Sequence, residues 1–224
     1  MKQFSKSVVV VAGGVGSRMG KEVPKQFLLL KDKPILMHTL DRFYNYSKEL
    51  EIILVLAAEE KENWVSLCNR YSFTVPHRVV SGGKTRFHSV QAGLAEVESE
   101  LVAVHDGVRP FVSKSLLERC FQEAAIHQAV IPVVDVVDSI RKVSREALSE
   151  TVDRKRYKLV QTPQVFRTSV LKRAYKQEFT SFFTDDASVV EAEGLSVHLV
   201  EGARENIKIT TPFDLKIAEA LLSC

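Results

Sequence analysis

Apolar residues along the chain fall into two kinds of block that alternate. Short runs rich in Val, Ile and Leu have the length of a buried strand, and longer stretches repeat their apolar residues every three to four positions, as one face of a helix requires. We expect strands at 7–12, 52–57, 73–80, 101–104, 130–134, 161–166, 196–200 and 207–209. We expect helices at 34–44, 59–70, 113–127, 168–178 and 212–222, one ending near 98 and one beginning at 184.

This alternation predicts a single α/β domain over residues 1–224, built on a doubly wound, mainly parallel sheet. Ligands bind such sheets at the carboxyl ends of the strands. The loops after the first, third and fourth expected strands are the ones rich in glycine, proline and charge. We therefore expect the functional site at that edge of the sheet.

The pattern changes between residues 136 and 157, where two strand-like stretches flank a polar middle with little apolar surface. This composition predicts a projecting β-hairpin arm over 136–157. A lone hairpin is marginally stable in water, so the arm needs a surface to pack against. A second copy of the chain would supply it, which indicates a homodimer. A flexible surface loop is the alternative interpretation.

Composition narrows the class of protein. The 224 residues are 45% hydrophobic and 26% charged, as in ordinary globular proteins, and a net charge of +3 gives no indication of nucleic-acid binding. No apolar run approaches the roughly 20 residues of a membrane span. Three widely spaced cysteines favour reduced thiols and a cytoplasmic location over disulfides or a zinc site. The six histidines show no metal-ligand spacing.

The loop after the first strand carries the most distinctive pattern. Gly13, Gly14 and Gly16 lack side chains, so the backbone can bend tightly and turn its N–H groups toward a ligand. Arg18 and Lys25 follow and can neutralise negative charge. A strand, a bare loop and two spaced cations suit a polyphosphate, although a simple glycine turn with two surface cations is the alternative.

Two familiar nucleotide-binding patterns do not fit. A dinucleotide fingerprint requires G-x-G-x-x-G, but Gly14 and Gly16 are followed by Gly20, one residue too far. A P-loop requires a glycine five residues before G-K-[ST], and Arg78 stands at that position before 83–85. These spacings argue against a dehydrogenase and a P-loop enzyme.

Charged residues follow the expected strand at 101–104. Asp106 can bind a divalent cation or a hydroxyl group, and Arg109 can bind a phosphate or orient the carboxylate. A purely structural Asp–Arg pair remains an alternative. His105 is expected to be structural.

A second glycine loop at 81–90 contains Gly82, Gly83, Arg86 and Ser89. Its backbone groups and polar side chains suit a nucleotide base and ribose. A turn that only begins the next helix would explain the pattern equally well.

Two further cations are harder to place. Lys208 lies between isoleucines in a short β-like run, from which it could point into a site. Arg154 lies in the arm and is one of four neighbouring cations, with Lys155, Arg156 and Lys158, among which spacing does not choose. The chain offers no Ser-His-Asp or Cys-His arrangement. Direct phosphoryl-type transfer needs no protein nucleophile, only positioning and charge neutralisation.

Motifs spread along nearly the whole chain identify a family. They are Ala12–Met19, Pro24–Phe27, Ser81–Val90, His105–Pro110, Thr151–Arg154, Gln161–Gln164, Thr184–Ser188 and Asn206–Thr210. With these motifs in this order, the chain resembles the cytidylyltransferases that act on sugar phosphates and isoprenoid precursors. Within that family the motifs are most similar to the methylerythritol phosphate cytidylyltransferases of the non-mevalonate isoprenoid pathway.

The resemblance implies a Rossmann-like nucleotidyltransferase fold and a reaction. CTP and 2-C-methyl-D-erythritol 4-phosphate would give 4-diphosphocytidyl-2-C-methyl-D-erythritol and pyrophosphate, by direct in-line attack of the substrate phosphate on the α-phosphate. It also implies Mg²⁺, held mainly by the CTP phosphates with Asp106 as the candidate protein ligand. A homodimer whose arm reaches the neighbouring site is implied too, so that Arg154 acts in trans.

The resemblance also implies roles for individual residues. The catalytic residues would be Arg18, Lys25, Arg154 and Lys208. The nucleotide pocket would comprise Ala12, Gly13, Gly14, Gly16, Gly82, Gly83, Arg86 and Ser89. The substrate-side contacts would be Asp106, Arg109 and Thr184.

Three alternatives stay open. Gly13, Lys84 and the pair Gly107-Val108 are similar to the related ribitol-5-phosphate cytidylyltransferases. Arg86 and the arm motif 151–154 favour the methylerythritol enzymes. A nucleotide-binding regulatory module without catalysis is a second alternative. A dehydrogenase is the third, and it is disfavoured by the glycine spacing.

Overall fold

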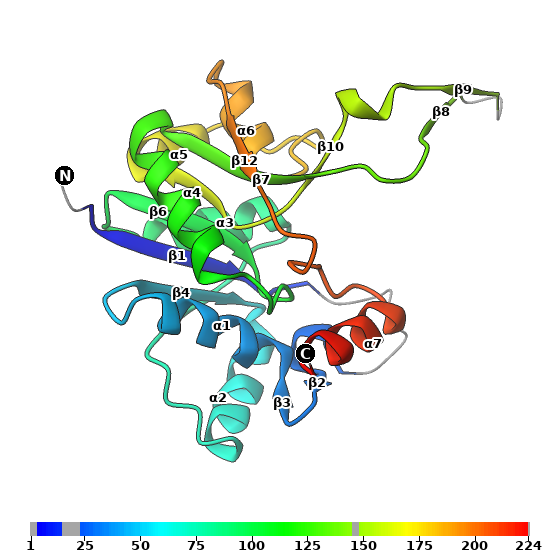
Figure 1. The fold of residues 1–224 in the computed structure, drawn as a ribbon. Coiled ribbons are helices and arrows are strands. Elements are labelled where there is room, and N and C mark those ends of the chain that lie inside the picture. The colour runs from blue at the N-terminus through cyan, green and yellow to red at the C-terminus, as the bar shows by residue number, and fades with distance from the viewer. Residues whose placement is uncertain (1–3, 15–22, 145–147, 224) are drawn as a thin grey trace.

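The computed structural model describes residues 4–14, 23–144 and 148–223. Its centre is an eight-stranded sheet, with the strands in the order β10-β7-β11-β6-β1-β4-β5 and β12 also paired with β7 (Figure 1). The strands are β1 (Lys6–Val11), β4 (Glu51–Leu56), β5 (Arg78–Ser81), β6 (Leu101–Asp106), β7 (Ala129–Asp135), β10 (Lys158–Val160), β11 (Gln164–Arg167) and β12 (His198–Glu201).

Most of the sheet is parallel. β1 pairs in parallel with both β4 and β6, β4 with β5, and β7 with β12. β11 runs antiparallel to β6 and to β7, and β10 runs antiparallel to β7. Because β11 opposes both of its neighbours, β6 and β7 point the same way. The expectation of a mainly parallel α/β sheet is confirmed.

Helices cover both faces of this sheet. They are α1 (Ile35–Tyr46), α2 (Lys61–Arg70), α3 (Arg86–Ala95), α4 (Lys114–His127), α5 (Thr168–Ala174), α6 (Asp186–Ala192) and α7 (Pro212–Leu221). Successive strand residues point to opposite faces. Val8 and Val10 of β1 therefore share a core with Leu40 of α1 and Phe121 of α4, whereas Val9 shares the other core with residues of α3, α5 and α6. This arrangement is the doubly wound architecture expected from the sequence. No helix among the described residues is long and apolar enough to cross a membrane.

The strands expected at 161–166 and 196–200 begin later, at Gln164 and His198. Two other expected strands differ more from the structure. The segment 73–80 is extended only from Arg78, since Pro76 has no N–H to donate to a neighbouring strand. The segment 207–209 is not a strand. Ile209 instead packs in a third core beside α7, where it is fully buried and its N–H donates to the Val108 carbonyl at 3.0 Å.

The segment between β7 and β10 projects from the rest of the molecule (Figure 1). It contains the antiparallel pair β8 (Arg141–Val143) and β9 (Ser149–Thr151), followed by the short 3-10 helix η4 (Arg154–Arg156). Every described residue of β8 and β9 is exposed. The segment therefore contains a β-hairpin, and its role as an arm for dimerisation stays a prediction.

Smaller elements lie between β1 and α1. They are the 3-10 helix η2 (Lys25–Phe27) and the two-residue strands β2 (Leu29–Leu30) and β3 (Lys33–Pro34), and a further 3-10 turn, η3 (Ala58–Glu60), precedes α2. Phe27 of η2 is buried and stacks on Trp64 of α2, with ring centroids 6.0 Å apart. This packing fixes η2, and with it Lys25, against the body of the domain.

Candidate functional site

A cavity of about 270 Å³ lies at the carboxyl ends of β1 and β6, the edge predicted from the sequence. Both glycine loops, η2, the end of β6 and the segment after β12 contribute to its wall. The lining residues are Val11, Ala12, Gly13, Gly14, Lys25, Gln26, Gly83, Lys84, Thr85, Arg86, Ser89, Asp106, Val108 and Lys208. One carboxylate and several cations give this wall a positive balance, which suits an anionic ligand.

The first glycine loop leaves β1 directly beside the cavity. The N–H of Ala12 donates to the Val55 carbonyl at 2.9 Å, which extends the pairing of β1 with β4 by one residue. Gly13 and Gly14 then line the cavity, and Lys25 lines it from η2. Gly16 and Arg18, which were also assigned to this site, lie outside the described residues.

The second glycine loop is packed tightly against the start of α3. A Cβ on Gly82 would lie 2.8 Å from the Ser89 hydroxyl, and one on Gly83 would lie 2.5 Å from the His88 Cβ. The N–H of Gly83 donates to the buried Ser89 hydroxyl at 3.2 Å. The missing side chains are therefore required by close approach, and Gly82 supports the loop without lining the cavity.

Arg86 is held by an ion pair inside the protein. Its guanidinium donates to both carboxylate oxygens of the fully buried Asp186, at 3.0 and 2.6 Å, and the Tyr175 hydroxyl donates to the same carboxylate at 2.6 Å. Burial alone would lower the pKa of Arg86, but the Asp186 and Asp106 carboxylates together outweigh burial and the pKa is raised. Arg86 lines the cavity, and its best hydrogen bonds join α3 to α6.

Asp106 is surrounded by three cations. Its Oδ2 lies 3.1 Å from Lys208 Nζ and 3.1 Å from Arg109 Nε, and its Oδ1 lies 3.9 Å from Arg86 Nε. Burial would raise the pKa of Asp106, but the charges of Lys208, Arg86 and Arg109 together hold the pKa well below its usual value. The carboxylate is therefore ionised and positions Lys208.

Arg109 supports Asp106 from behind. It is almost fully buried, does not line the cavity, and donates from Nη1 to the Asn206 carbonyl at 2.8 Å. The Asn206 amide in turn donates to the Thr162 carbonyl at 2.8 Å. Arg109 thus fits the structural Asp–Arg pair, the alternative left open by the sequence.

His105 belongs to the same supporting network. Its Nε2 donates to the Arg109 carbonyl at 3.1 Å, so its Nδ1 accepts from the Thr162 hydroxyl, also at 3.1 Å. The Thr162 hydroxyl accepts from the Asp106 N–H at 3.1 Å. Burial lowers the pKa of His105 to about 4, so the ring is neutral, and the structural role expected for it is supported.

Two predicted site residues lie away from this cavity. Arg154 is exposed on the arm, where its guanidinium donates to the Val137 carbonyl. Thr184 is exposed just before Asp185, the N-cap residue of α6. Neither residue lines the cavity.

Several contributing residues were not named among the predicted site residues. Gln26, Lys84, Thr85 and Val108 line the cavity. Lys84 and Thr85 belong to the second glycine loop, and Gln26 directly follows Lys25 in a quoted motif. Asp186 acts through Arg86, a residue 100 positions earlier in the chain, and only its place in the motif at 184–188 could have indicated a role.

A larger hollow of about 630 Å³ lies at the opposite edge of the sheet. Phe4, Lys6, Ser47, Glu51 and Ser99 are among its lining residues, near the amino ends of β1 and β4. It lacks both glycine loops and the Asp106 cluster. The cavity at the carboxyl ends is therefore the better candidate for a functional site.

Comparisons with known proteins agree over nearly the full chain. The family model for 2-C-methyl-D-erythritol 4-phosphate cytidylyltransferase (IspD) matches residues 7–224. The protein of that name from Bacteroides thetaiotaomicron is 61% identical over 223 residues, 99% of this chain and 100% of that protein. The crystal structure of the Thermus thermophilus protein of that name is 34% identical, with a TM-score of 0.79, covering 97% of this chain and 98% of that one. The structure of the 4-diphosphocytidyl-2C-methyl-D-erythritol synthase from Anaerococcus prevotii is 30% identical, with a TM-score of 0.82 and 98% coverage of both chains.

Proposed function

The chain belongs to the 2-C-methyl-D-erythritol 4-phosphate cytidylyltransferase family, and we propose from this premise how its cavity performs the family's reaction. CTP and 2-C-methyl-D-erythritol 4-phosphate react to give 4-diphosphocytidyl-2-C-methyl-D-erythritol and pyrophosphate. The observation that carries the assignment of the site is the meeting of two glycine loops, Lys25 and the Asp106–Lys208 pair around one cavity. The same relatives favour this reaction over the ribitol-5-phosphate alternative.

We assign the triphosphate to the glycine-loop side of the cavity. The backbone at Gly13 and Gly14 carries no side chains that would keep phosphate oxygens away, and Lys25 faces the same space from η2. The α-phosphate gains negative charge as a second phosphate attacks it in line. A fixed cation beside it stabilises that crowded state more than the bound ground state. We propose this role for Lys25, and for Arg18 by resemblance.

We assign the incoming phosphate to Lys208. Its Nζ is held 3.1 Å from Asp106 Oδ2, while 40% of the side chain stays exposed and available to a ligand. Asp106 also fits a hydroxyl-binding role, since its Oδ1 has only the 3.9 Å contact with Arg86 among the ion pairs described. Arg109 positions Asp106 and is not placed against substrate. Gly83 and Ser89 form the opposite wall, where we place the cytidine.

The described residues do not fit a Mg²⁺ ion bound by the protein alone. Asp106 is the only carboxylate among the described lining residues, and it is already paired with Lys208 and Arg109. Mg²⁺ prefers several oxygen ligands and retains water, so phosphates suit it better than this carboxylate. We therefore propose that Mg²⁺ is bound by the CTP phosphates and that Asp106 is not its ligand.

We propose that Arg154 completes the site of a second copy of the chain. The arm projects from the body of its own chain (Figure 1), and Arg154 does not line the cavity of that chain. The arm and the adjoining strand β10 expose apolar side chains that water does not favour. These are Val137, Val143, Leu148, Tyr157, Leu159 and Val160. Packing them against a partner gives a homodimer in which Arg154 contacts the partner's substrate phosphate. We place this enzyme in the cytoplasm, where buried thiols such as that of Cys120 stay reduced.

One assay tests the proposed reaction. Pyrophosphate release is measured with CTP and either 2-C-methyl-D-erythritol 4-phosphate or ribitol 5-phosphate, at equal concentrations with Mg²⁺ present. We expect rapid release with the first substrate and little with the second. Preference for ribitol 5-phosphate would overturn the substrate assignment. Binding of CTP without release from either would support a regulatory module.

A further inference from the structure

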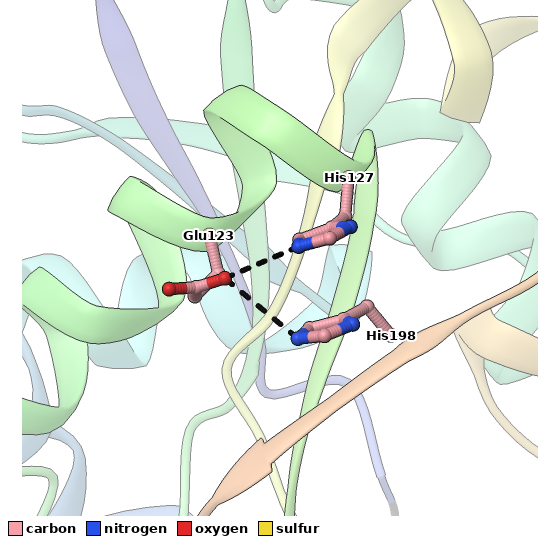
Figure 2. Close-up of side chains that lie close together, drawn as sticks. All are labelled: Glu123, His127 and His198. Atoms are coloured by element: carbon pink, nitrogen blue, oxygen red, sulfur yellow. Dashed lines mark ion pairs between the residues drawn. The ribbon is translucent and has the colours of Figure 1, made fainter.

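Two histidines and a glutamate converge on the surface of the molecule (Figure 2). Glu123 and His127 lie one turn apart on α4, and His198 is the first residue of β12. The Nε2 atom of His127 lies 3.4 Å from Glu123 Oε2, and that of His198 lies 3.7 Å from the same oxygen. Spacing along the sequence gives no sign of this cluster, because folding brings a strand residue to a helical pair.

The two imidazole rings lie face to face beside the same carboxylate. They stack with centroids 3.8 Å apart and planes within 4°, and Figure 2 shows a nitrogen of each ring facing the Glu123 carboxylate. Both N–O distances exceed the roughly 2.7–3.2 Å of an ordinary N–H···O hydrogen bond.

The spacing of the donor atoms suits a divalent transition metal. All three ligand atoms lie within 4.8 Å of one another. Zn²⁺ binds His nitrogen and carboxylate oxygen at about 2.0–2.2 Å, which puts the ligands of a tetrahedral ion roughly 3.3 Å apart. Two separations, 3.4 and 3.7 Å, are already close to that value. Since the stacked rings have nearly parallel planes, each must turn out of the stack before both nitrogens face one ion. The side chains of His127 and His198 are each 41% exposed, which leaves room for this rotation and for a water ligand.

This cluster lies at the edge of the sheet opposite the cavity. His198 pairs with Val130, near the start of β7, whereas Asp106 ends β6, which runs in the same direction as β7. None of the three residues lines the cavity. The nearest cation along α4, Arg119, donates its guanidinium to the Glu201 carbonyl at the far end of β12. A metal at the cluster is thus separate from one bound to nucleotide phosphates.

We propose that Glu123, His127 and His198 bind one Zn²⁺ ion or a chemically similar divalent transition metal. Two imidazole nitrogens and one carboxylate are a ligand set that Zn²⁺ favours and Mg²⁺ does not. The ion joins the last turn of α4 to the first residue of β12. Because unfolding separates these two segments, the bound ion stabilises the native state.

Calorimetric titration of the nucleotide-free protein with ZnCl₂ tests the site. We expect one Zn²⁺ per chain, no comparable binding of MgCl₂, and a higher Tm in ZnCl₂. His198→Ala and Glu123→Gln should each weaken Zn²⁺ binding by at least about tenfold, as loss of even an outer-shell partner does. Glu219→Gln, which removes an exposed carboxylate from α7, should leave the affinity unchanged.

Histidine ring nitrogen NMR provides a second readout. On addition of Zn²⁺, the Nε2 signals of His127 and His198 should shift together, with the same stoichiometry. His198→Gln serves as a conservative second variant, whose circular dichroism verifies the fold. Equal Zn²⁺ affinity in the wild type and the His198 variants would overturn the proposal. So would the absence of Zn²⁺ binding at millimolar concentration, which would leave the three side chains as an ion-pair cluster only.

Discussion

Lys208 Nζ lies 3.1 Å from Asp106 Oδ2, and this contact joins the segment after β12 to the carboxyl end of β6. The two residues are far apart in the sequence, yet the fold brings them to the same wall of one cavity. Asp106 is fixed by Arg109 and by the Thr162 hydroxyl. Lys208 is therefore held in place before any ligand arrives.

Removing this positioned charge tests the assignment of the incoming phosphate. We expect Lys208→Ala to lower kcat/KM for 2-C-methyl-D-erythritol 4-phosphate by about 10²-fold, as loss of one positioned charge-stabilising donor does. The Kd for CTP should change little. Steady-state kinetics and CTP titration measure both quantities, with Lys216→Ala on the exposed side of α7 as the control. A change confined to CTP affinity would contradict the assignment.

Lys25 has a different expected signature. Because its charge matters most when negative charge builds at the α-phosphate, Lys25→Ala should lower kcat by roughly 10²–10³-fold while altering the Kd for CTP far less. Lys25→Arg keeps the charge and should retain more activity. Single-turnover kinetics measures the rate of the chemical step, and calorimetry measures the Kd for CTP. An unchanged kcat would remove Lys25 from the chemistry.

A complementation experiment tests whether the arm contributes Arg154 to the site of the partner chain. Lys25→Ala and Arg154→Ala are each expected to be nearly inactive as homodimers. In a mixed dimer, one site combines the intact Lys25 of one chain with the intact Arg154 of the other, so activity should reappear at up to half of the wild-type value. Co-expressed, differently tagged chains allow the mixed dimer to be purified. No recovery in a confirmed mixed dimer would argue against an arm that acts in trans.

The Arg86–Asp186 pair should matter for stability. Asp186→Asn removes the main counter-charge of Arg86 and leaves only the Asp106 carboxylate, 3.9 Å away, among the ion pairs described. Loss of one partner from a buried ion pair costs about 3 kcal/mol or more. Tyr175→Phe removes only one hydrogen bond to the same carboxylate and should cost about 1–2 kcal/mol. Urea unfolding gives both values. Equal, negligible effects would show that the pair contributes nothing to the fold.

His105 makes stability depend on pH. Its folded-state pKa is lowered by burial to about 4, so between about 4 and its ordinary value of 6.5 the unfolded chain binds the proton and the native state does not. Stability therefore falls as pH drops through this window, by up to about 3 kcal/mol for this group. Between pH 7 and pH 5, the free energy of unfolding should fall less in His105→Gln than in the wild type. An identical pH dependence in the two proteins would contradict the inference that the buried His105 ring is neutral.

Much of the fold followed from local patterns. The run of valines that forms β1 and the glycines after it predicted both a buried strand and the loop that lines the cavity. Non-local contacts were not predictable in this way. The sequence around Ile209 resembles a strand, but its apolar residues pack against α7, and the Ile209 N–H donates to the Val108 carbonyl outside any strand.

The candidate site shows the same limit. The cations and glycines were identified by spacing and by resemblance, but their partners were not. Arg86 was assigned to the nucleotide pocket, and its main contact is Asp186, a residue 100 positions away that spacing cannot connect to it. His127 and His198 likewise meet only because α4 lies beside β12. Interactions between distant segments require the three-dimensional structure.

A crystal structure of the protein soaked with CTP tests the central claim most directly. We predict that the triphosphate lies along Gly13 and Gly14 with Lys25 beside the α-phosphate, and that the base lies toward Gly83 and Ser89. Well-ordered CTP bound elsewhere, with this cavity free of nucleotide, would contradict the proposed site.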